Sequence, residues 1–174
     1  SESMLGSHSA YFNGSTGYIT ANSNQYKFQS GDFSVSLWAN PEVIDNSYDG
    51  LITTENAALN CAWSIVRINT NSYYQVRFGT TINGINYPAV SPGEWNMYTF
   101  TKTGTTLKVY FNGEYLATYT VPSTHSCGAE VLGLGTYRNN EGTTNLFQGY
   151  LDEVGIWNRV LTDSEITNIY NRSV

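Results

Sequence analysis

The chain has 174 residues, and its 8 lysines and arginines against 14 aspartates and glutamates give a formal net charge of −6 at pH 7. With 40% hydrophobic residues the chain is expected to fold, and one domain over residues 1–174, with its core over about 10–170, accounts for this length. The acidic balance argues against nucleic acid and against an anionic membrane surface as partners, and no apolar run is long enough for membrane insertion.

Short extended segments separated by turn residues follow one another along the chain. In order they are AYFNG, GYITA, DFSVSLWANP, AWSIVRI, YYQVRFG, WNMYTFTKTG, TLKVYFNGEYLATYTV, EVLGLGTY and GYLDEVGIW. In the third segment Phe33, Val35 and Leu37 alternate with serines, which predicts a strand, and Asn112-Gly113 predicts a hairpin turn. Strands spaced by about 8–12 residues are typical of an all-β sandwich or barrel.

One helix is predicted, directly after the last of these strands. Thr162 and Glu165 have the spacing of a capping box, and Leu161 and Ile166 have that of a hydrophobic staple. Ile166 and Ile169 then mark one apolar face. Because so short a helix is marginal alone, we expect it to dock on the sandwich.

The chain has two cysteines, Cys61 and Cys127. Neither belongs to a C-x-x-C motif, so zinc binding is not indicated. The two residues either form a disulfide, as an oxidising compartment would favour, or remain separate thiols in a β core. The sequence leaves both alternatives open.

The order of these segments resembles the concanavalin A-like lectin/glucanase superfamily, and within it the laminin G-like domains related to pentraxins. The most specific part is the closing strand and helix, FQGYLDEVGIWNRVLTDSEI, followed by YFNG at residues 110–113 and GEW at residues 93–95. The resemblance extends from about Ala10 to Tyr170. It implies an all-β, concanavalin A-like jelly-roll sandwich of two antiparallel sheets with one short C-terminal helix.

The same resemblance implies a structural calcium ion held by Asn13, Gly14 and Asp152. Carboxylate, amide and backbone carbonyl oxygens are the ligands that Ca²⁺ takes in proteins. The alternative for Asp152 is that it accepts hydrogen bonds from backbone N–H groups where the first turn meets the last strand. Glu153 would point to the opposite side of a regular strand and is given no catalytic role.

Catalysis is not predicted. Glucan hydrolases that share this fold carry several acids on one strand in an E-x-D-x-x-E arrangement, and no such set occurs in the chain. Asp152 and Glu153 are adjacent and so face opposite ways, while Glu42 and Asp45 have the wrong spacing. Motifs such as G-x-S-x-G and H-E-x-x-H are also missing from the sequence.

Non-catalytic domains of this family commonly bind glycans and sometimes proteins. Sugar binding uses aromatic faces and planar polar groups. The candidate ligand-binding residues are Asp45, Asn46, Tyr48 and Asp49 in segment 43–52, Tyr137, Arg138 and Asn139 in segment 135–145, and Trp63, Tyr74 and Arg77, together with Arg67, on two strands that should be neighbours. In the third group the alternative is structural, with Trp63 in the core and Arg67 and Arg77 in cross-strand ion pairs. Trp38, Trp95 and Trp157 are predicted to be core residues.

The leading hypothesis is therefore a non-catalytic, lectin-like carbohydrate-binding module of a larger extracellular or surface protein. The alternative is a structural or adhesive display domain, on a virion, fibre or cell surface, that binds protein. A glucan hydrolase ranks third because the acids are missing. A glycan is the expected partner, a protein partner stays open, and no nucleic acid is expected.

Overall fold

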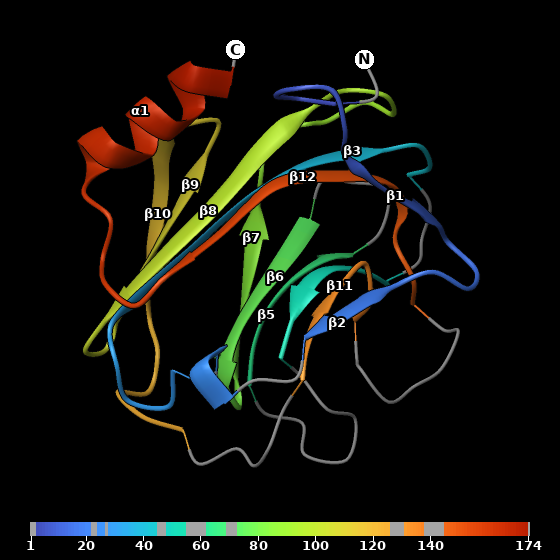
Figure 1. The fold of residues 1–174 in the computed structure, drawn as a ribbon. Helices are drawn as coiled ribbons and strands as arrows, with labels where there is room; N and C mark the ends of the chain where they lie inside the picture. Colours follow the sequence, from blue (N-terminus) through green and yellow to red (C-terminus); the bar gives the residue numbers. More distant parts are fainter. Residues whose placement is uncertain are drawn as a thin grey trace.

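A computed structural model of the chain describes residues 3–21, 24–26, 28–44, 48–54, 62–68, 73–125, 131–137 and 145–173. Within these ranges the chain forms two six-stranded antiparallel sheets that face one another, with one α-helix outside them (Figure 1). This arrangement confirms the predicted jelly-roll sandwich with a short C-terminal helix. No helix in the described ranges is long and apolar enough to cross a membrane.

The first sheet contains the chain's first and last strands side by side. Its order is β1 (Ala10–Asn13), β12 (Gln148–Trp157), β3 (Phe33–Pro41), β8 (Asn96–Thr103), β9 (Thr106–Phe111) and β10 (Glu114–Thr120). The second sheet has the order β2 (Ile19–Ala21), β11 (Leu132–Leu134), β4 (Tyr48–Thr53), β5 (Ala62–Ile68), β6 (Tyr73–Gly79) and β7 (Thr81–Asn86). A 3-10 turn, Asn24–Tyr26, and helix α1, Asp163–Ser173, complete the described elements.

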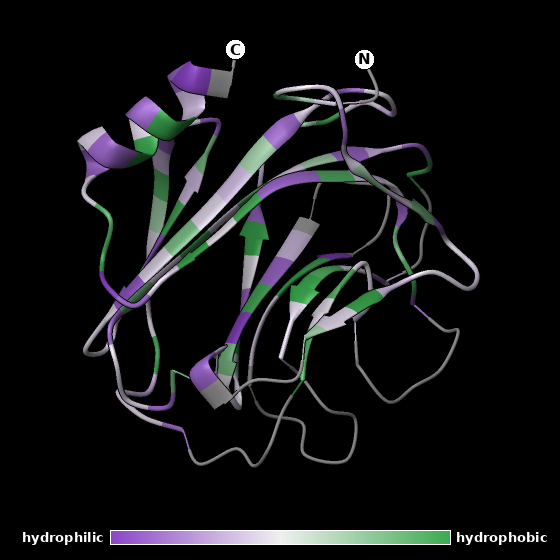
Figure 2. Cartoon of the chain, in the orientation of Figure 1, coloured by the Kyte–Doolittle hydropathy of each residue, from purple (hydrophilic) through white to green (hydrophobic). Residues whose placement is uncertain are grey.

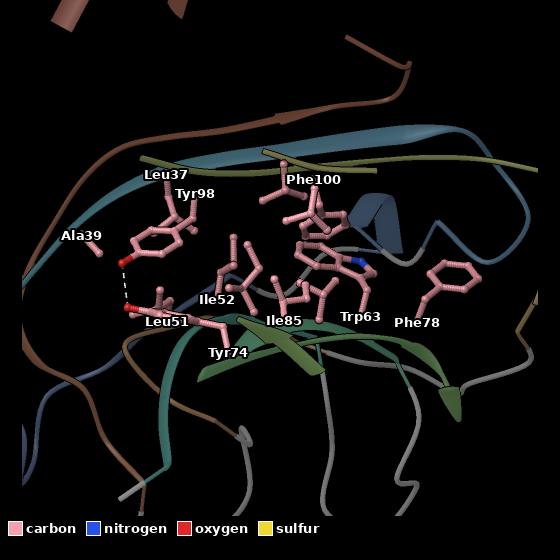
Figure 3. Close-up of a cluster of buried hydrophobic side chains, with 14 of the residues drawn as sticks. Leu37, Ala39, Leu51, Ile52, Trp63, Tyr74, Phe78, Ile85, Tyr98 and Phe100 are labelled. Carbon is pink, nitrogen blue, oxygen red and sulfur yellow. Dashed lines mark hydrogen bonds between the residues drawn. The ribbon is translucent and has the colours of Figure 1, made fainter. Parts of the chain in front are cut away.

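The main core lies between the two sheets. Phe33, Val35 and Leu37 of β3 belong to one cluster with Trp63 and Ile65 of β5, and each of the five side chains has 0% of its surface exposed. Figure 3 shows Leu37 and Trp63 pointing from the two sheets into the core between them. The spacing by two residues along each strand is the alternation that the sequence predicted for a strand with one face buried. Burial of each such side chain contributes roughly 1.5–3 kcal/mol to folding.

Helix α1 packs on the outer face of the first sheet and forms a second cluster there. The cluster contains Trp38, Met97, Tyr110, Leu161 and Ile166, and in Figure 2 hydrophobic and hydrophilic residues alternate along the helix. The predicted residues begin the helix: the backbone N–H of Thr162 donates to Glu165 Oε2 at 2.8 Å, and the Glu165 N–H donates to Thr162 Oγ1 at 3.2 Å. The capping box and the docking of the helix are thus confirmed.

The predicted hairpin turn at Asn112-Gly113 connects β9 to β10. Both residues have positive φ angles, 50° and 82°, as a type I′ turn requires. Helix α1 also passes close by, since a Cβ added at Gly113 would lie 2.8 Å from Tyr170 Cβ. Glycine is therefore required here both for the turn and for the helix.

Two expectations about the outer face need correction. Strand β12 is not regular, because its pairing with β3 shifts between Asp152 and Gly155 and Glu153 adopts a φ of 47°. The extra residue is a β-bulge, so the simple alternation assumed for Glu153 does not hold. Of the tryptophans predicted to be core residues, Trp38 is buried, whereas Trp95 and Trp157 are only partly buried at the edge of the cluster under α1.

Candidate functional site

Two of the predicted binding segments come together at one end of the sandwich. Strands β1 and β3 end there, and β4 and β12 begin there (Figure 1). The backbone N–H of Glu42 donates to the Gln148 carbonyl at 3.0 Å, and Gly50 of β4 forms a parallel bridge with Leu146. We call this region, with its described residues from segments 42–50 and 136–148, the loop end.

A stacked tyrosine pair joins the two segments. The rings of Tyr48 and Tyr137 have centroids 5.7 Å apart and planes at 16°. Tyr48 has 42% of its surface exposed, whereas Tyr137 is buried against Val66 and its N–H donates to the Asn145 carbonyl at 3.2 Å. Two residues that the sequence predicted in separate segments are thus brought into direct contact.

The close approach of the segments depends on a glycine. A Cβ added at Gly50 would lie 2.0 Å from the backbone carbon of Thr136. A side chain at this position would push β4 away from the chain that leads to Tyr137. Gly50 is therefore a positioning residue for the tyrosine pair.

Asp49, which follows Tyr48 on β4, points to the opposite face of the sheet and forms an ion pair with Arg67 there. They are direct partners in the β4–β5 ladder, and their side chains are 7% and 1% exposed. Arg67 Nη2 also donates to the Val43 carbonyl at 3.2 Å. The cross-strand ion pair that was the alternative role of Arg67 is therefore present.

A cavity of about 200 Å³ opens beside this pair. It is lined by Gly14, Val43, Asp49, Arg67, Asn145, Leu146 and Gln148. The charges of Asp49 and Arg67 offset one another, and the carboxamides of Asn145 and Gln148 can both donate and accept hydrogen bonds. The cavity therefore suits an uncharged group that carries hydroxyls.

Trp63 and Tyr74 do not belong to a binding site, and their prediction as ligand contacts is wrong. Both side chains point from the second sheet into the core (Figure 3), where they are 0% and 1% exposed. Trp63 Nε1 donates to the Tyr26 carbonyl at 2.6 Å, and the Tyr74 and Tyr98 hydroxyls are 2.6 Å apart. Burial raises the pKa of Tyr74 to about 12, so this hydroxyl stays protonated.

Arg77 faces the other way. It neighbours Ser64 of β5 and Ile82 of β7, on the outer face of the second sheet that also carries Val66. The strands are neighbours, as predicted, but the side chains of Tyr74 and Arg77 lie on opposite faces because they are three residues apart. Arg77 is also buried, so the predicted third group is not one site.

Four of the predicted binding residues, Asp45, Asn46, Arg138 and Asn139, lie outside the described residues, as do Cys61 and Cys127. Their described neighbours in the chain, Tyr48 and Tyr137, belong to the stacked pair. Sequence analysis did not select Asn145 or Gln148 as ligand contacts, although Gln148 directly precedes the closing strand motif.

The structure does not bring the predicted calcium ligands together. Asn13 pairs with Gln148 in the β1–β12 register, four residues along β12 from Asp152, which separates the two residues by about 13 Å. One calcium ion contacts its oxygen ligands at about 2.3–2.6 Å, so Asn13 and Asp152 cannot share an ion. Among the described residues, no group of three or more histidine, cysteine, aspartate or glutamate side chains gathers as a metal site. Calcium binding by this chain stays a prediction, and it would need other oxygen atoms.

Both residues have backbone partners instead. Asp152 Oδ2 accepts from the N–H of Met4 at 2.9 Å and Oδ1 from the N–H of Glu153 at 2.9 Å. Asn13 Oδ1 accepts from the N–H groups of Ser15 and Thr16, each at 3.0 Å. Asp152 thus makes the backbone hydrogen bonds of its alternative role, and Asn13 closes the turn that follows β1.

The sequence matches a family model. That model, described as the concanavalin A-like lectin/glucanases superfamily, covers residues 13–167. The chain belongs to this superfamily. Comparison with the curated proteins finds no match.

Solved structures with the same fold are distant in sequence. The chain resembles the CBM40 of the Ruminococcus gnavus IT-sialidase bound to α2,3 sialyllactose, with 14% identity, a TM-score of 0.77, and 97% of this chain and 99% of that chain covered. It resembles domain 4 of a GH43 extracellular arabinanase from Geobacillus stearothermophilus in complex with arabinotriose, with 22% identity, a TM-score of 0.66, and 93% and 76% covered.

A third structure is the binding domain of botulinum neurotoxin DC in complex with rat synaptotagmin II, with 17% identity and a TM-score of 0.66. The match covers 90% of this superfamily member but 40% of the toxin chain. At these identities the three likenesses show the fold.

Proposed function

We propose that the chain is a non-catalytic, lectin-like carbohydrate-binding module of a larger extracellular or surface protein, and that it takes an uncharged sugar at the loop end. The observation that carries the proposal is the Tyr48–Tyr137 pair, in which a half-exposed ring stacks on a buried one. An aromatic face supported in this way can stack on the C–H surface of a sugar at low entropic cost.

The charge at the loop end supports an uncharged ligand. Asp49 and Arg67 neutralise each other beside the cavity, and the remaining polar side chains that line it, those of Asn145 and Gln148, are amides. Amides can meet sugar hydroxyls as donors and as acceptors. A carboxylate on the ligand would have to compete with Asp49 for Arg67.

The same lining argues against hydrolysis. Glycosidases use two carboxyl groups, about 5–9.5 Å apart, on the two sides of the scissile bond. Asp49 is the one carboxylate that lines the described cavity, and Arg67 holds it in the ion pair. Binding without catalysis is the better account of this arrangement.

Two of the structural neighbours were solved with sugars, sialyllactose and arabinotriose, which supports glycan binding. The toxin binding domain was solved with a protein, synaptotagmin II. An adhesive display domain that binds protein is therefore the second candidate function.

A glycan array with the purified chain tests the proposal, run with the wild type, Tyr48→Ala and Tyr115→Ala. Tyr115 is also exposed but lies on β10 of the other sheet, which makes it a matched control. We expect the wild type to bind uncharged glycans and Tyr48→Ala to bind them with roughly tenfold lower affinity. Tyr115→Ala should bind them as the wild type does.

An array on which the wild type binds no glycan would contradict the proposal and favour the display domain. Loss of binding in EDTA would support the predicted calcium ion, and persistence of binding would separate the sugar site from any metal.

A further inference from the structure

Three aromatic side chains form a row on the outer face of the first sheet, close to the loop end. Tyr11 on β1 and Tyr150 on β12 are direct ladder partners, with ring centroids 4.9 Å apart. Trp95, directly before β8, continues the row with its centroid 6.5 Å from that of Tyr150. We call these three residues the aromatic row. It runs across the strands, because β3 lies between β12 and β8 in the sheet (Figure 1).

The row is accessible at its edge. Tyr11 has 53% of its surface exposed, and Tyr150 and Trp95 are half-buried. The Tyr11 hydroxyl donates to Glu42 Oε2 at 3.1 Å, which fixes the ring. A carboxylate accepts about four hydrogen bonds, so exposed Glu42 keeps acceptor positions for hydroxyl donors on a ligand.

The row is continuous with the cavity at the loop end. Gln148 lines the cavity and lies two residues before Tyr150, on the same face of β12. Val43, which also lines the cavity, directly follows Glu42. The cavity, the Gln148 amide, the Glu42 carboxylate and the tyrosine rings therefore lie in sequence over one edge of the sandwich.

From this continuity we propose that the binding surface extends from the cavity over Gln148 onto the aromatic row, so that the ligand is an uncharged oligosaccharide chain rather than a single terminal sugar. The inference rests on the proposed function. The cavity, at about 200 Å³, takes one small polar group, and the rings offer successive faces for further sugar units.

The polar border of the row supports a sugar chain over a protein surface as the occupant. Protein-binding patches are depleted of charged groups at their centre. Here the Glu42 carboxylate accepts a hydrogen bond from the hydroxyl of the exposed Tyr11. This carboxylate and the net charge of −6 disfavour binding of acidic sugar chains. An uncharged sugar can stack its C–H surface on the rings and donate hydrogen bonds from its hydroxyls to the carboxylate.

Calorimetric titration with size ladders of neutral oligosaccharides tests this extension. The probes are cello-, malto-, xylo- and arabino-oligosaccharides, each from the monosaccharide to the hexasaccharide, and the proteins are the wild type, Tyr11→Ala and Tyr115→Ala. For at least one ladder we expect wild-type affinity to rise with chain length. Tyr11→Ala should bind the longest members with roughly tenfold lower affinity and the shortest with nearly unchanged affinity. Tyr115→Ala should match the wild type.

Wild-type affinity that does not depend on chain length, or a Tyr11→Ala variant that keeps the full increase, would overturn the extended surface and leave the cavity site standing. A wild type that binds none of the ladders and no glycan on the array would overturn both proposals. Loss of long-chain affinity in Tyr115→Ala as well as Tyr11→Ala would also count against the row, since Tyr115 lies on β10 at the opposite edge of the sheet.

Discussion

Asp49 on β4 and Arg67 on β5 lie directly opposite each other, and their ion pair is buried at the point where the two predicted binding segments meet. Removal of one partner leaves an uncompensated charge among buried groups. We therefore expect Arg67→Met to lower the free energy of unfolding by about 3–5 kcal/mol, measured by urea denaturation.

The matched control is Arg159→Met, since the side chain of Arg159 is 52% exposed in its pair with Glu165. We expect that change to cost less than about 1 kcal/mol. If the two variants lose the same unfolding free energy, the buried pair contributes no more to stability than the exposed one. The double variant Asp49→Leu with Arg67→Met should recover part of the loss, because no unpaired charge remains.

Gly50→Ala is expected to disturb the loop end. The added carbon would lie 2.0 Å from the Thr136 backbone, so β4 or the segment before Tyr137 must shift. We expect a loss of at least about 1–3 kcal/mol in unfolding free energy and weaker glycan binding. Gly31→Ala is the control, since nothing lies within 4 Å of a Cβ at that position, and a comparable loss there would refute the explanation.

Glu165 makes the stability of helix α1 dependent on pH. The Arg159 guanidinium, helped by the Thr162 N–H, lowers the pKa of this carboxyl from 4.5 to about 2. A folded-state pKa below the unfolded value means that the contribution is complete above pH 4.5 and disappears as the pH falls toward about 2. Wild type should thus lose more unfolding free energy over this interval than Glu165→Gln. Parallel curves for the two proteins would contradict the prediction.

Asp152 holds the segment before β1 on the outer face of the first sheet. Its carboxylate accepts from the N–H groups of Met4 and Leu5, at 2.9 and 3.3 Å. We expect Asp152→Ala to lower the unfolding free energy by about 1–3 kcal/mol and to speed proteolytic cleavage near these residues. The loss should be equal in calcium and in EDTA. A loss seen only in calcium would show that Asp152 does bind an ion.

The features predicted correctly are those whose signal is local. The Asn112-Gly113 turn needs two residues that tolerate positive φ, and the capping box needs Thr162 and Glu165 three residues apart. Alternation along β3 likewise identified Phe33 as a core residue. Each of these patterns is contained within a few neighbouring residues.

The errors concern relationships between distant segments. Trp63 and Tyr74 are aromatic residues of the kind that sugar sites use. Alternation alone does not say which face of β5 and β6 meets the other sheet, so it could not show that both side chains are in the core. The β1–β12 register, which separates Asn13 from Asp152, and the bulge at Glu153 depend on pairing between strands that lie far apart in the sequence. The meeting of Tyr48 with Tyr137 has the same origin, and so could be seen only in the fold.

The placement of β12 between β1 and β3 has a consequence for synthesis of the chain. Until residues 148–157 leave the ribosome, one edge of β3 has no hydrogen-bonding partner. Strand β1, which pairs with β12, has no partner strand at that stage. An unpaired edge of this kind is a template for association with other chains. The first sheet therefore stays incomplete, and its open edge available for aggregation, until nearly the whole domain has been synthesised.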